Sequence, residues 1–261
     1  MKVILFEIGN FPIRSYGLIF VLAIMLGMGV AYYLARGSKY QKHIVDMTTF
    51  VIIGSIIGAR FWHVFFFQWD SYKNNLGDFF AIWNGGLAIQ GGLVGGFIAG
   101  FIYTKIKKLD FWEFADVMAP GIIFGQGVGR IACFLNGDAF GSPTGSNFGI
   151  VYPEGTMAYS TYGSQPLWPA EIWEGQWDFV VFGLLLLIKN KTLPKGSIFL
   201  IYNILYSIGR FSLGFFRGDS PRYFLELTAG QLTSLSVIIL SIVIMVYFYV
   251  RNNSKSKKAT V

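Results

Sequence analysis

Charged residues are scarce in this chain. Lys, Arg, Asp and Glu make up 13% of its 261 residues, and apolar residues make up 54%, whereas an ordinary soluble domain carries about 25% charged residues. This composition excludes a typical water-soluble globular protein. The single cysteine, Cys133, excludes an intrachain disulfide, and two histidines without metal-ligand spacing argue against a zinc site.

Long apolar runs occupy most of the sequence instead. Seven runs are about as long as a helix that crosses a ~30 Å hydrocarbon layer, and they cover residues 15–35, 47–67, 85–104, 114–135, 168–188, 196–216 and 228–250. The fifth is the weakest candidate because Glu171, Glu174 and Asp178 lie in its first half. The first lacks the features of a cleaved signal peptide, so we expect it to be retained. The sequence therefore predicts an all-α integral membrane protein, a bundle of about seven transmembrane helices.

Basic residues indicate the orientation of this bundle. Thirteen of the 21 basic residues follow the first, third, fifth and seventh runs; they are Arg36, Lys39, Lys42, Lys105, Lys107, Lys108, Lys189, Lys191, Lys195, Arg251, Lys255, Lys257 and Lys258. Cytoplasmic loops retain Lys and Arg, so we expect the N-terminus outside and the C-terminus in the cytoplasm. The net charge of +7 then reflects attraction to anionic lipid headgroups and needs no nucleic acid.

The same pattern predicts the domain organisation. Residues 1–251 form one membrane-embedded domain, in which residues 138–167, without Lys or Arg, form an extracytoplasmic segment between the fourth and fifth spans. Residues 252–261 form a basic cytoplasmic tail that we expect to be disordered.

Polar residues gather at the end of the fourth apolar run. Arg130, Cys133, Asn136 and Asp138 follow one another within nine residues. An arginine inside a membrane segment costs a few kcal/mol and usually has a function, so Arg130 is a candidate site residue. For Cys133 we favour a small buried apolar side chain over a reactive thiol.

A second polar stripe lies in the sixth run. Tyr206, Arg210 and Arg217 are four and seven residues apart and are expected on one helix face. Two guanidinium groups there suit a phosphate, which they bind in a bidentate manner, although Arg217 could equally extend to the interface. Arg60, one turn from His63, is expected to be structural or interfacial.

Glycines recur at four-residue spacing, as in Gly54/Gly58, Gly92/Gly96/Gly100 and Gly125/Gly129, and most are expected to allow close helix packing. The cluster at residues 84–92 differs, because four glycines surround Gln90. It predicts a broken or re-entrant helix start, which membranes tolerate only where it lines a cavity or is buried in protein. Gln90 is thus a candidate cavity residue, and a helix-to-helix hydrogen bond is nearly as good an interpretation.

Taken together, these motifs resemble the bacterial phosphatidylglycerol:prolipoprotein diacylglyceryl transferases. The likeness covers most of the chain: Pro12 to Gly17, the glycines of 85–92, Asp116, Ala119-Pro120, Gly125-Gln126, Gly129-Arg130, Phe134, Asn136-Gly137, Gly141, Tyr206, Arg210-Phe211, Arg217 and Asp219. The pattern from Asp116 to Gly141 is the specific one.

The resemblance implies a multi-pass enzyme of the bacterial cytoplasmic membrane with its active site toward the outer side. It transfers the diacylglyceryl group of phosphatidylglycerol to the lipobox cysteine thiol of a preprolipoprotein, which forms a thioether and releases glycerol phosphate, without a cofactor or metal. Arg130, Arg210 and Arg217 would bind phosphatidylglycerol. The implied catalytic set is Arg130, Arg210, Tyr16, Tyr206, Gln90, Asn136 and Asp138.

Several positions depart from the family's pattern. Gln90 stands where a histidine is usual, Cys133 replaces Asn, Asp138 replaces Glu, Gly214 replaces Glu, and the run from Pro169 to Glu174 replaces a His-Pro-x-Gln-Leu-Tyr-Glu pattern. A catalytically silent homologue that binds phosphatidylglycerol or a lipobox peptide therefore remains the alternative. A small-solute transporter is weaker, since the two halves show no internal repeat.

Overall fold

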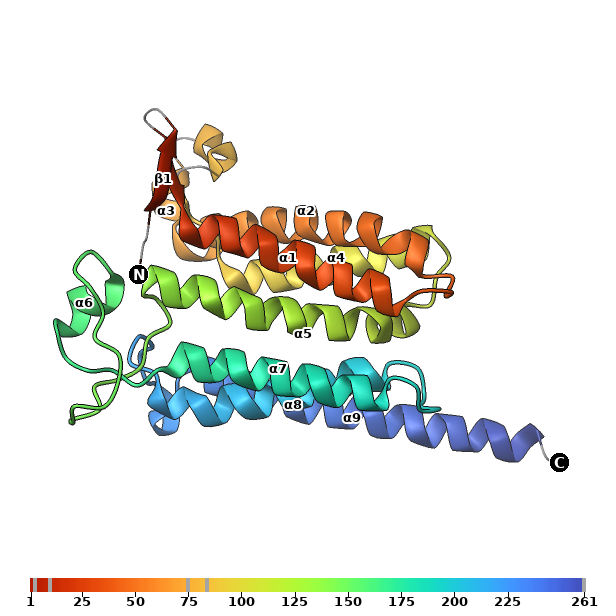
Figure 1. Ribbon diagram of the computed structural model, residues 1–261. Coiled ribbons are helices and arrows are strands. Elements are labelled where there is room, and N and C mark those ends of the chain that lie inside the picture. Colours follow the sequence, from red (N-terminus) through yellow and green to blue (C-terminus); the bar gives the residue numbers. More distant parts are fainter. Residues whose placement is uncertain (2–3, 9–10, 74–75, 83–84, 260–261) are drawn as a thin grey trace. The chain divides into compact units, whose positions relative to one another are not determined.

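The computed structural model describes residues 1, 4–8, 11–73, 76–82 and 85–259 (Figure 1). They form two compact units, which we describe separately. Unit 1 comprises Met1–Leu34 and Ala115–Val261, and unit 2 comprises Ala35–Phe114.

Helices dominate both units. The long helices are α1 (Ser15–Leu34), α2 (Ile44–Trp62), α4 (Ile89–Ile106), α5 (Phe111–Asn136), α7 (Ala170–Ile188), α8 (Ser197–Leu213) and α9 (Ala229–Ala259). The short ones are α3 (Trp69–Tyr72) and α6 (Met157–Tyr162). Short 3-10 helices cover Gln41–His43, Leu76–Phe80, Gly214–Phe216 and Phe224–Glu226, and a π-helical turn covers His63–Phe67. α9 includes most of the basic tail that the sequence predicts to be disordered.

Within the described residues, six segments are long and apolar enough to cross a membrane. They are Ser15–Leu34, Gln41–Phe67, Ile89–Ile106, Phe111–Asn136, Ser197–Phe216 and Ala229–Asn252. These findings confirm a helical, multi-span membrane protein. α7 is as long as the others, but Glu171, Glu174 and Asp178 make it too rich in charge to qualify by composition alone.

A small β-hairpin precedes α1, and the sequence analysis did not predict it. Strand β1 (Ile4–Ile8) pairs antiparallel with β2 (Phe11–Arg14), with Ile8 opposite Phe11 and Ile4 opposite Arg14. The hairpin leads directly into Ser15, the first residue of α1.

In unit 2, α2 and α4 pack closely through glycines. A Cβ atom at Gly58 would lie only 2.8 Å from Cα of Gly95, and one at Gly54 would lie 2.9 Å from the carbonyl oxygen of Gly95. Because real Cβ atoms do not approach backbone so closely, these positions admit only glycine. The packing interpretation of the Gly54/Gly58 spacing is therefore confirmed.

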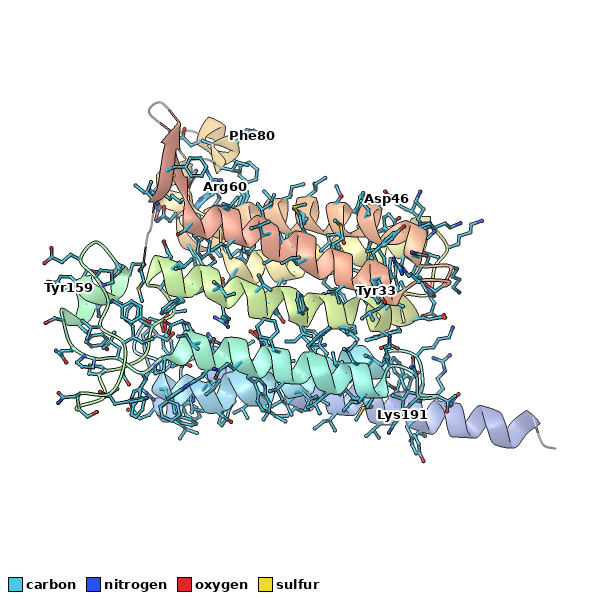
Figure 2. The ribbon with its side chains drawn as sticks, viewed as in Figure 1. Tyr33, Asp46, Arg60, Phe80, Tyr159 and Lys191 are labelled. Carbon is cyan, nitrogen blue, oxygen red and sulfur yellow. The ribbon has the colours of Figure 1, made fainter. Side chains whose placement is uncertain are left out.

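Arg60, at the end of α2, holds the segment that leads to α4. Its guanidinium donates to the carbonyl oxygens of Phe79 (2.8 Å), Gly85 (2.6 Å) and Gly86 (3.0 Å), as well as Asp78 and Ala81. Figure 2 shows Arg60 and Asp46 at opposite ends of α2. The residue is buried, so the structural interpretation of Arg60 is confirmed.

The glycine cluster before α4 is irregular, as predicted. Gly85 and Gly86 have φ of 83° and 75°, values that favour glycine, and helix α4 starts only at Ile89. Asn84 lies outside the described residues. A Cβ at Gly86 would lie 2.7 Å from Nη1 of Arg60. A side chain at this position would therefore collide with the arginine.

In unit 1, α5, α7 and α8 share a core of Ala119, Ile123, Val181, Leu185 and Tyr202. The Asp116 carboxylate of α5 fixes the start of α8, since it accepts from the backbone N–H groups of Gly196 (2.6 Å) and Phe199 (2.8 Å). Figure 1 shows α7, α8 and α9 running alongside one another. This arrangement brings residues of three helices together near the start of α7.

The segment at residues 138–167 forms a packed cap around Phe140, Tyr152, Ala158 and Leu167. Isolated bridges join Pro143 and Ile150 to Leu167. Figure 2 shows Tyr159 of this segment and Lys191, which follows α7, at opposite ends of unit 1.

The close approach of α1 and α5 can be tested by a substitution at Gly27. A Cβ there would lie 2.6 Å from the carbonyl oxygen of Gly121, whereas one at Gly29 on the same helix would meet nothing within 4 Å. We expect Gly27→Val to destabilise the protein by about 1–3 kcal/mol, because overpacking forces the helices apart. Thermal unfolding in detergent should show a lower midpoint for Gly27→Val and little change for Gly29→Val. Equal midpoints would contradict this packing.

Candidate active site

Three arginines converge on Glu174 of α7. Arg130 of α5 pairs with Oε2 of Glu174 at 2.6 Å, Arg210 of α8 pairs with Oε1, and Nη1 of Arg217 lies 3.4 Å from both oxygens. The Glu174 side chain is only 4% exposed. A buried charge needs such partners, because removal from water is costly.

Arg130 reaches Glu174 because α5 and α7 approach closely. A Cβ at Gly175, next to Glu174, would lie 3.0 Å from Cβ of Arg130. Arg210 in turn packs over the first turn of α9, where a Cβ at Gly230 would lie 3.2 Å from its Nη2 atom. Glycines therefore leave the space for the base of the Arg130 side chain and for the guanidinium group of Arg210.

Arg217 enters the cluster from the segment after α8, and not from the helix face that the sequence predicts. α8 ends at Leu213, and Arg217 has extended backbone after the turn Gly214–Phe216, so the prediction that it shares a helix face with Arg210 is wrong. It also does not extend to the interface, because its side chain is 7% exposed and pairs with Asp219. An isolated bridge to Gly141 ties its backbone to the 138–167 segment.

The space beside Gly214 is occupied by a side chain of α9. A Cβ there would lie 2.7 Å from Cγ of Gln231. Gln231 is fully buried, accepts from the Thr228 N–H group at 2.9 Å and donates to Phe211 at 3.2 Å. Glu174, not a residue of α8, supplies the negative charge beside the arginines.

The ion pairs of the cluster join three arginines to two acids, and Asp178 and Glu171 lie within electrostatic range of the same arginines. Three guanidinium groups face two carboxylates, Glu174 and Asp219, in these pairs. The Arg130 and Arg210 side chains are 18% and 22% exposed, against 7% for Arg217. Arg130 and Arg210 therefore keep donors accessible for an anion.

The end of α5 brings further predicted residues together. Asn136 donates to Oδ2 of Asp138 at 2.9 Å, across Gly137 with φ of 70°. Tyr16, in the first turn of α1, lies within electrostatic range of Cys133, Asp138 and Arg130. Tyr206 lies in a similar range of Arg130, Arg210 and Asp178.

Gln90 belongs to unit 2 and is described apart from this cluster. It lies in the first turn of α4, and its side chain is exposed.

A cavity of about 160 Å³ lies between α5 and α7. Its wall consists of Gly127, Arg130, Ile131, Phe134, Glu171, Ile172, Gly175, Gln176 and Phe179. The exposed wall is almost entirely apolar, so the cavity suits hydrocarbon.

Glu171 is fixed by Tyr152, whose hydroxyl donates to its Oε1 atom. Burial and this hydrogen bond raise the pKa of Tyr152, so the phenol stays a protonated donor. The pair links the 138–167 segment to the first turn of α7.

The sequence analysis did not assign a role to Glu174, Glu171 or Tyr152. Glu171, Glu174 and Asp178 follow an i, i+3, i+7 spacing, which puts them on one helix face. That spacing could have indicated a row of carboxylates that pair with buried arginines. In the sequence, the three acids were taken only as evidence that this run is a weak membrane span.

Comparison with known proteins identifies the family of this chain. A model of the family described as prolipoprotein diacylglyceryl transferase matches residues 3–247. The chain belongs to this family. The phosphatidylglycerol–prolipoprotein diacylglyceryl transferase of Listeria monocytogenes serotype 4a (strain HCC23) is 37% identical over 250 residues, which cover 95% of this chain and 90% of the relative.

Relatives from other bacteria show nearly the same sequence identity to this chain. The protein of that name from Nostoc sp. (strain PCC 7120) is 34% identical over 255 residues, or 95% of this chain and 89% of its own. The protein from Acaryochloris marina is 36% identical over 219 residues, or 83% of this chain and 80% of its own. This family member therefore aligns along nearly its whole length.

Glu174 should be essential to the stability of the site. Glu174→Gln removes the shared partner of three guanidinium groups, and breaking a buried ion pair costs about 3–5 kcal/mol. We expect a clearly lower thermal midpoint in detergent. Glu154→Gln, at an exposed acid that accepts a hydrogen bond from Tyr159, should change stability by less than about 0.5 kcal/mol. Similar midpoints for both variants would contradict the central role of Glu174.

Proposed function

We propose that the Arg130–Glu174–Arg210–Arg217 cluster is the phosphatidylglycerol headgroup site of a prolipoprotein diacylglyceryl transferase. The chain is a transferase of this family, so it moves the diacylglyceryl group of phosphatidylglycerol to a prolipoprotein. The observation that carries the site assignment is the convergence of three arginines on one buried carboxylate. The partly exposed guanidinium groups of Arg130 and Arg210 suit a phosphodiester.

The chemistry follows from this placement. The lipobox cysteine loses its S–H proton to water, its sulfur forms a C–S bond with the glyceryl carbon that carries the phosphate, and the C–O bond to the phosphate breaks. The electron pair of that bond remains on the departing glycerol phosphate. Arg130 and Arg210, already oriented by Glu174, stabilise the charge that develops on the phosphate oxygen.

The other site residues of unit 1 act around this phosphate, and the role of Gln90 in unit 2 is assigned separately, from the resemblance. Tyr206, on α8 one turn before Arg210, is assigned to orienting the headgroup. Tyr16, Asn136 and Asp138 form the polar surface at the end of α5, where the acceptor segment would approach. Gln90 keeps an amide donor and acceptor and is assigned to orienting a substrate, since an amide has no usable proton affinity.

α7 completes a seven-span topology in this proposal. Of its three acids, Glu174 is paired with Arg130, Arg210 and Arg217, which offsets part of the cost of placing charge in a span. With seven spans, every basic loop lies in the cytoplasm and the 138–167 segment lies outside. The arginine cluster then faces the outer side of the bacterial cytoplasmic membrane.

The transfer itself is tested with purified protein, phosphatidylglycerol and a lipobox peptide, by the release of glycerol phosphate and the mass of the peptide. A protein that binds phosphatidylglycerol but releases no glycerol phosphate would be a silent homologue. Such a result would refute the transferase activity.

Conservative replacement of the arginines tests the headgroup site. Arg130→Lys and Arg210→Lys should each lower kcat/KM about 10- to 100-fold, because an ammonium cannot replace a planar two-pronged donor. Arg222→Lys, at an exposed arginine that bonds only backbone carbonyls among the groups described, is the matched control and should retain activity. Full activity of Arg130→Lys would refute the phosphate clamp.

Reporter fusions test the topology. Fusions after Lys107 and Lys255 should report a cytoplasmic position, and a fusion after Ser146 should report an external one. A cytoplasmic Ser146 would contradict both the span number and the outward-facing site.

A further inference from the structure

The connection between α8 and α9 carries three consecutive large apolar side chains that the rest of the described chain leaves exposed. Tyr223, Phe224 and Leu225 are 60%, 71% and 73% exposed, and we call these three residues the apolar tip. They lie outside the membrane-spanning segments, which end at Phe216 and begin again at Ala229. An exposed apolar patch in such a position is typical of a surface that meets a membrane or another protein.

The backbone of the connection fixes how the apolar tip is presented. The N–H group of Tyr223 donates to the carbonyl oxygen of Leu227 at 2.8 Å, and the N–H group of Leu227 donates to that of Phe224 at 3.2 Å. These bonds close a tight loop. Leu225 and Glu226 have φ of 54° and 58°, a left-handed conformation that is costly for residues with a side chain. Strain of this kind is retained where the surrounding structure enforces it, often at a functional surface.

Both ends of the loop are fixed to the arginine cluster. Before the loop, Nη1 of Arg217 lies 3.4 Å from Oε1 of Glu174. After the loop, Gly230 in the first turn of α9 packs against Arg210, since a Cβ there would lie 3.2 Å from Nη2. Figure 1 shows that α8 ends and α9 begins at the end of unit 1 that carries α6. The apolar tip therefore belongs to the same end of unit 1 as the candidate headgroup site.

The flanking spans place the apolar tip close to lipid. The segments Ser197–Phe216 and Ala229–Asn252 are each long and apolar enough to cross a membrane, and a short loop between two such helices stays at the membrane surface. Aromatic side chains are enriched at this depth. Apolar side chains here gain free energy when they leave water and enter between acyl chains. The position of the tip thus favours a lipid surface as its partner.

We propose that the apolar tip inserts into the outer leaflet of the membrane beside the arginine cluster. The proposal rests on the headgroup site and the topology stated above. The tip binds acyl chains through their apolar surface and does not select a headgroup. Because the loop is fixed to Arg210 and Arg217 at its two ends, its insertion holds these guanidinium groups at the depth of the lipid phosphates.

The depth of the tip can be measured with a spin label. Full-length protein with Cys133→Ala and Phe224→Cys is labelled with a nitroxide and placed in vesicles of phosphatidylcholine and phosphatidylglycerol. We expect the nitroxide to collide more often with oxygen, which concentrates in hydrocarbon, than with a water-soluble nickel complex. Ser146→Cys in the same background, at an exposed position of the 138–167 segment, is the control and should show the opposite preference. A signal at position 224 like that at position 146 would overturn the proposal.

The contribution of the tip to catalysis is tested by making it polar. Phe224→Ser combined with Leu225→Ser changes only exposed side chains, so the thermal midpoint should be preserved. With phosphatidylglycerol in vesicles, we expect KM for this lipid to rise about 3- to 10-fold with little change in kcat, because insertion scales with the apolar area buried. With short-chain phosphatidylglycerol supplied as dissolved monomers to protein in detergent, KM should stay close to that of the unmodified protein. Phe224→Leu keeps an apolar side chain and should behave like the unmodified protein in both assays.

Three kinetic results would contradict the proposal. An unchanged KM in vesicles would show that the tip does not serve the lipid site. An equal rise with both forms of phosphatidylglycerol would show a direct effect on the site, and a rise in KM for the lipobox peptide alone would assign the tip to the acceptor. Absence of glycerol phosphate release from the unmodified protein is a separate result, which refutes the transferase function and leaves the spin-label measurement of depth valid.

Discussion

The pairing of Glu174 with three arginines is the interaction on which the rest of unit 1 depends. It joins α5, α7, α8 and the extended segment after α8 at one buried carboxylate. Each arginine would be costly in an apolar bundle without a counter-charge, and Glu174 would be equally costly without them. Their mutual neutralisation lets four segments place charge inside the bundle. It also orients two guanidinium groups before a substrate arrives, which lowers the reorganisation needed when the phosphate departs.

Glycine makes this arrangement possible sterically. Gly175 and Gly230 leave room for Arg130 and Arg210, in the same way that Gly27 and Gly58 leave room for neighbouring backbones. In lipid, helices gain little from burying apolar surface, so close van der Waals packing provides much of their association. The small residues therefore serve the fold and the site together, since the helices that they bring close are the ones that carry the ionic cluster.

The sequence predicted those features that follow from local chemistry. Apolar runs predicted the positions of the long helices, and an arginine in such a run drew attention to Arg130, which the structure places in the ion-pair cluster. The hairpin before α1 was missed because short strands leave a weak pattern. Arg217 was placed on a helix because spacing alone does not reveal that α8 ends at Leu213. Glu174 was missed because its partners lie 36 to 44 residues away in the sequence. A sequence pattern does not show which residues so far apart come into contact.

The acidic face of α7 has a consequence for how the protein is made. A carboxylate at the centre of an inserting helix opposes insertion by about 2.5–3.5 kcal/mol on the translocon scale, and α7 has three acids within eight residues. It is synthesised after Arg130 and before Arg210 and Arg217. A helix of this composition enters the bilayer favourably when its partners are already beside it or arrive with it. In the proposed seven-span topology, integration of α7 therefore requires that α5 stays at the insertion site until α8 has been made, so that the proposed site and the order of membrane assembly depend on the same residues.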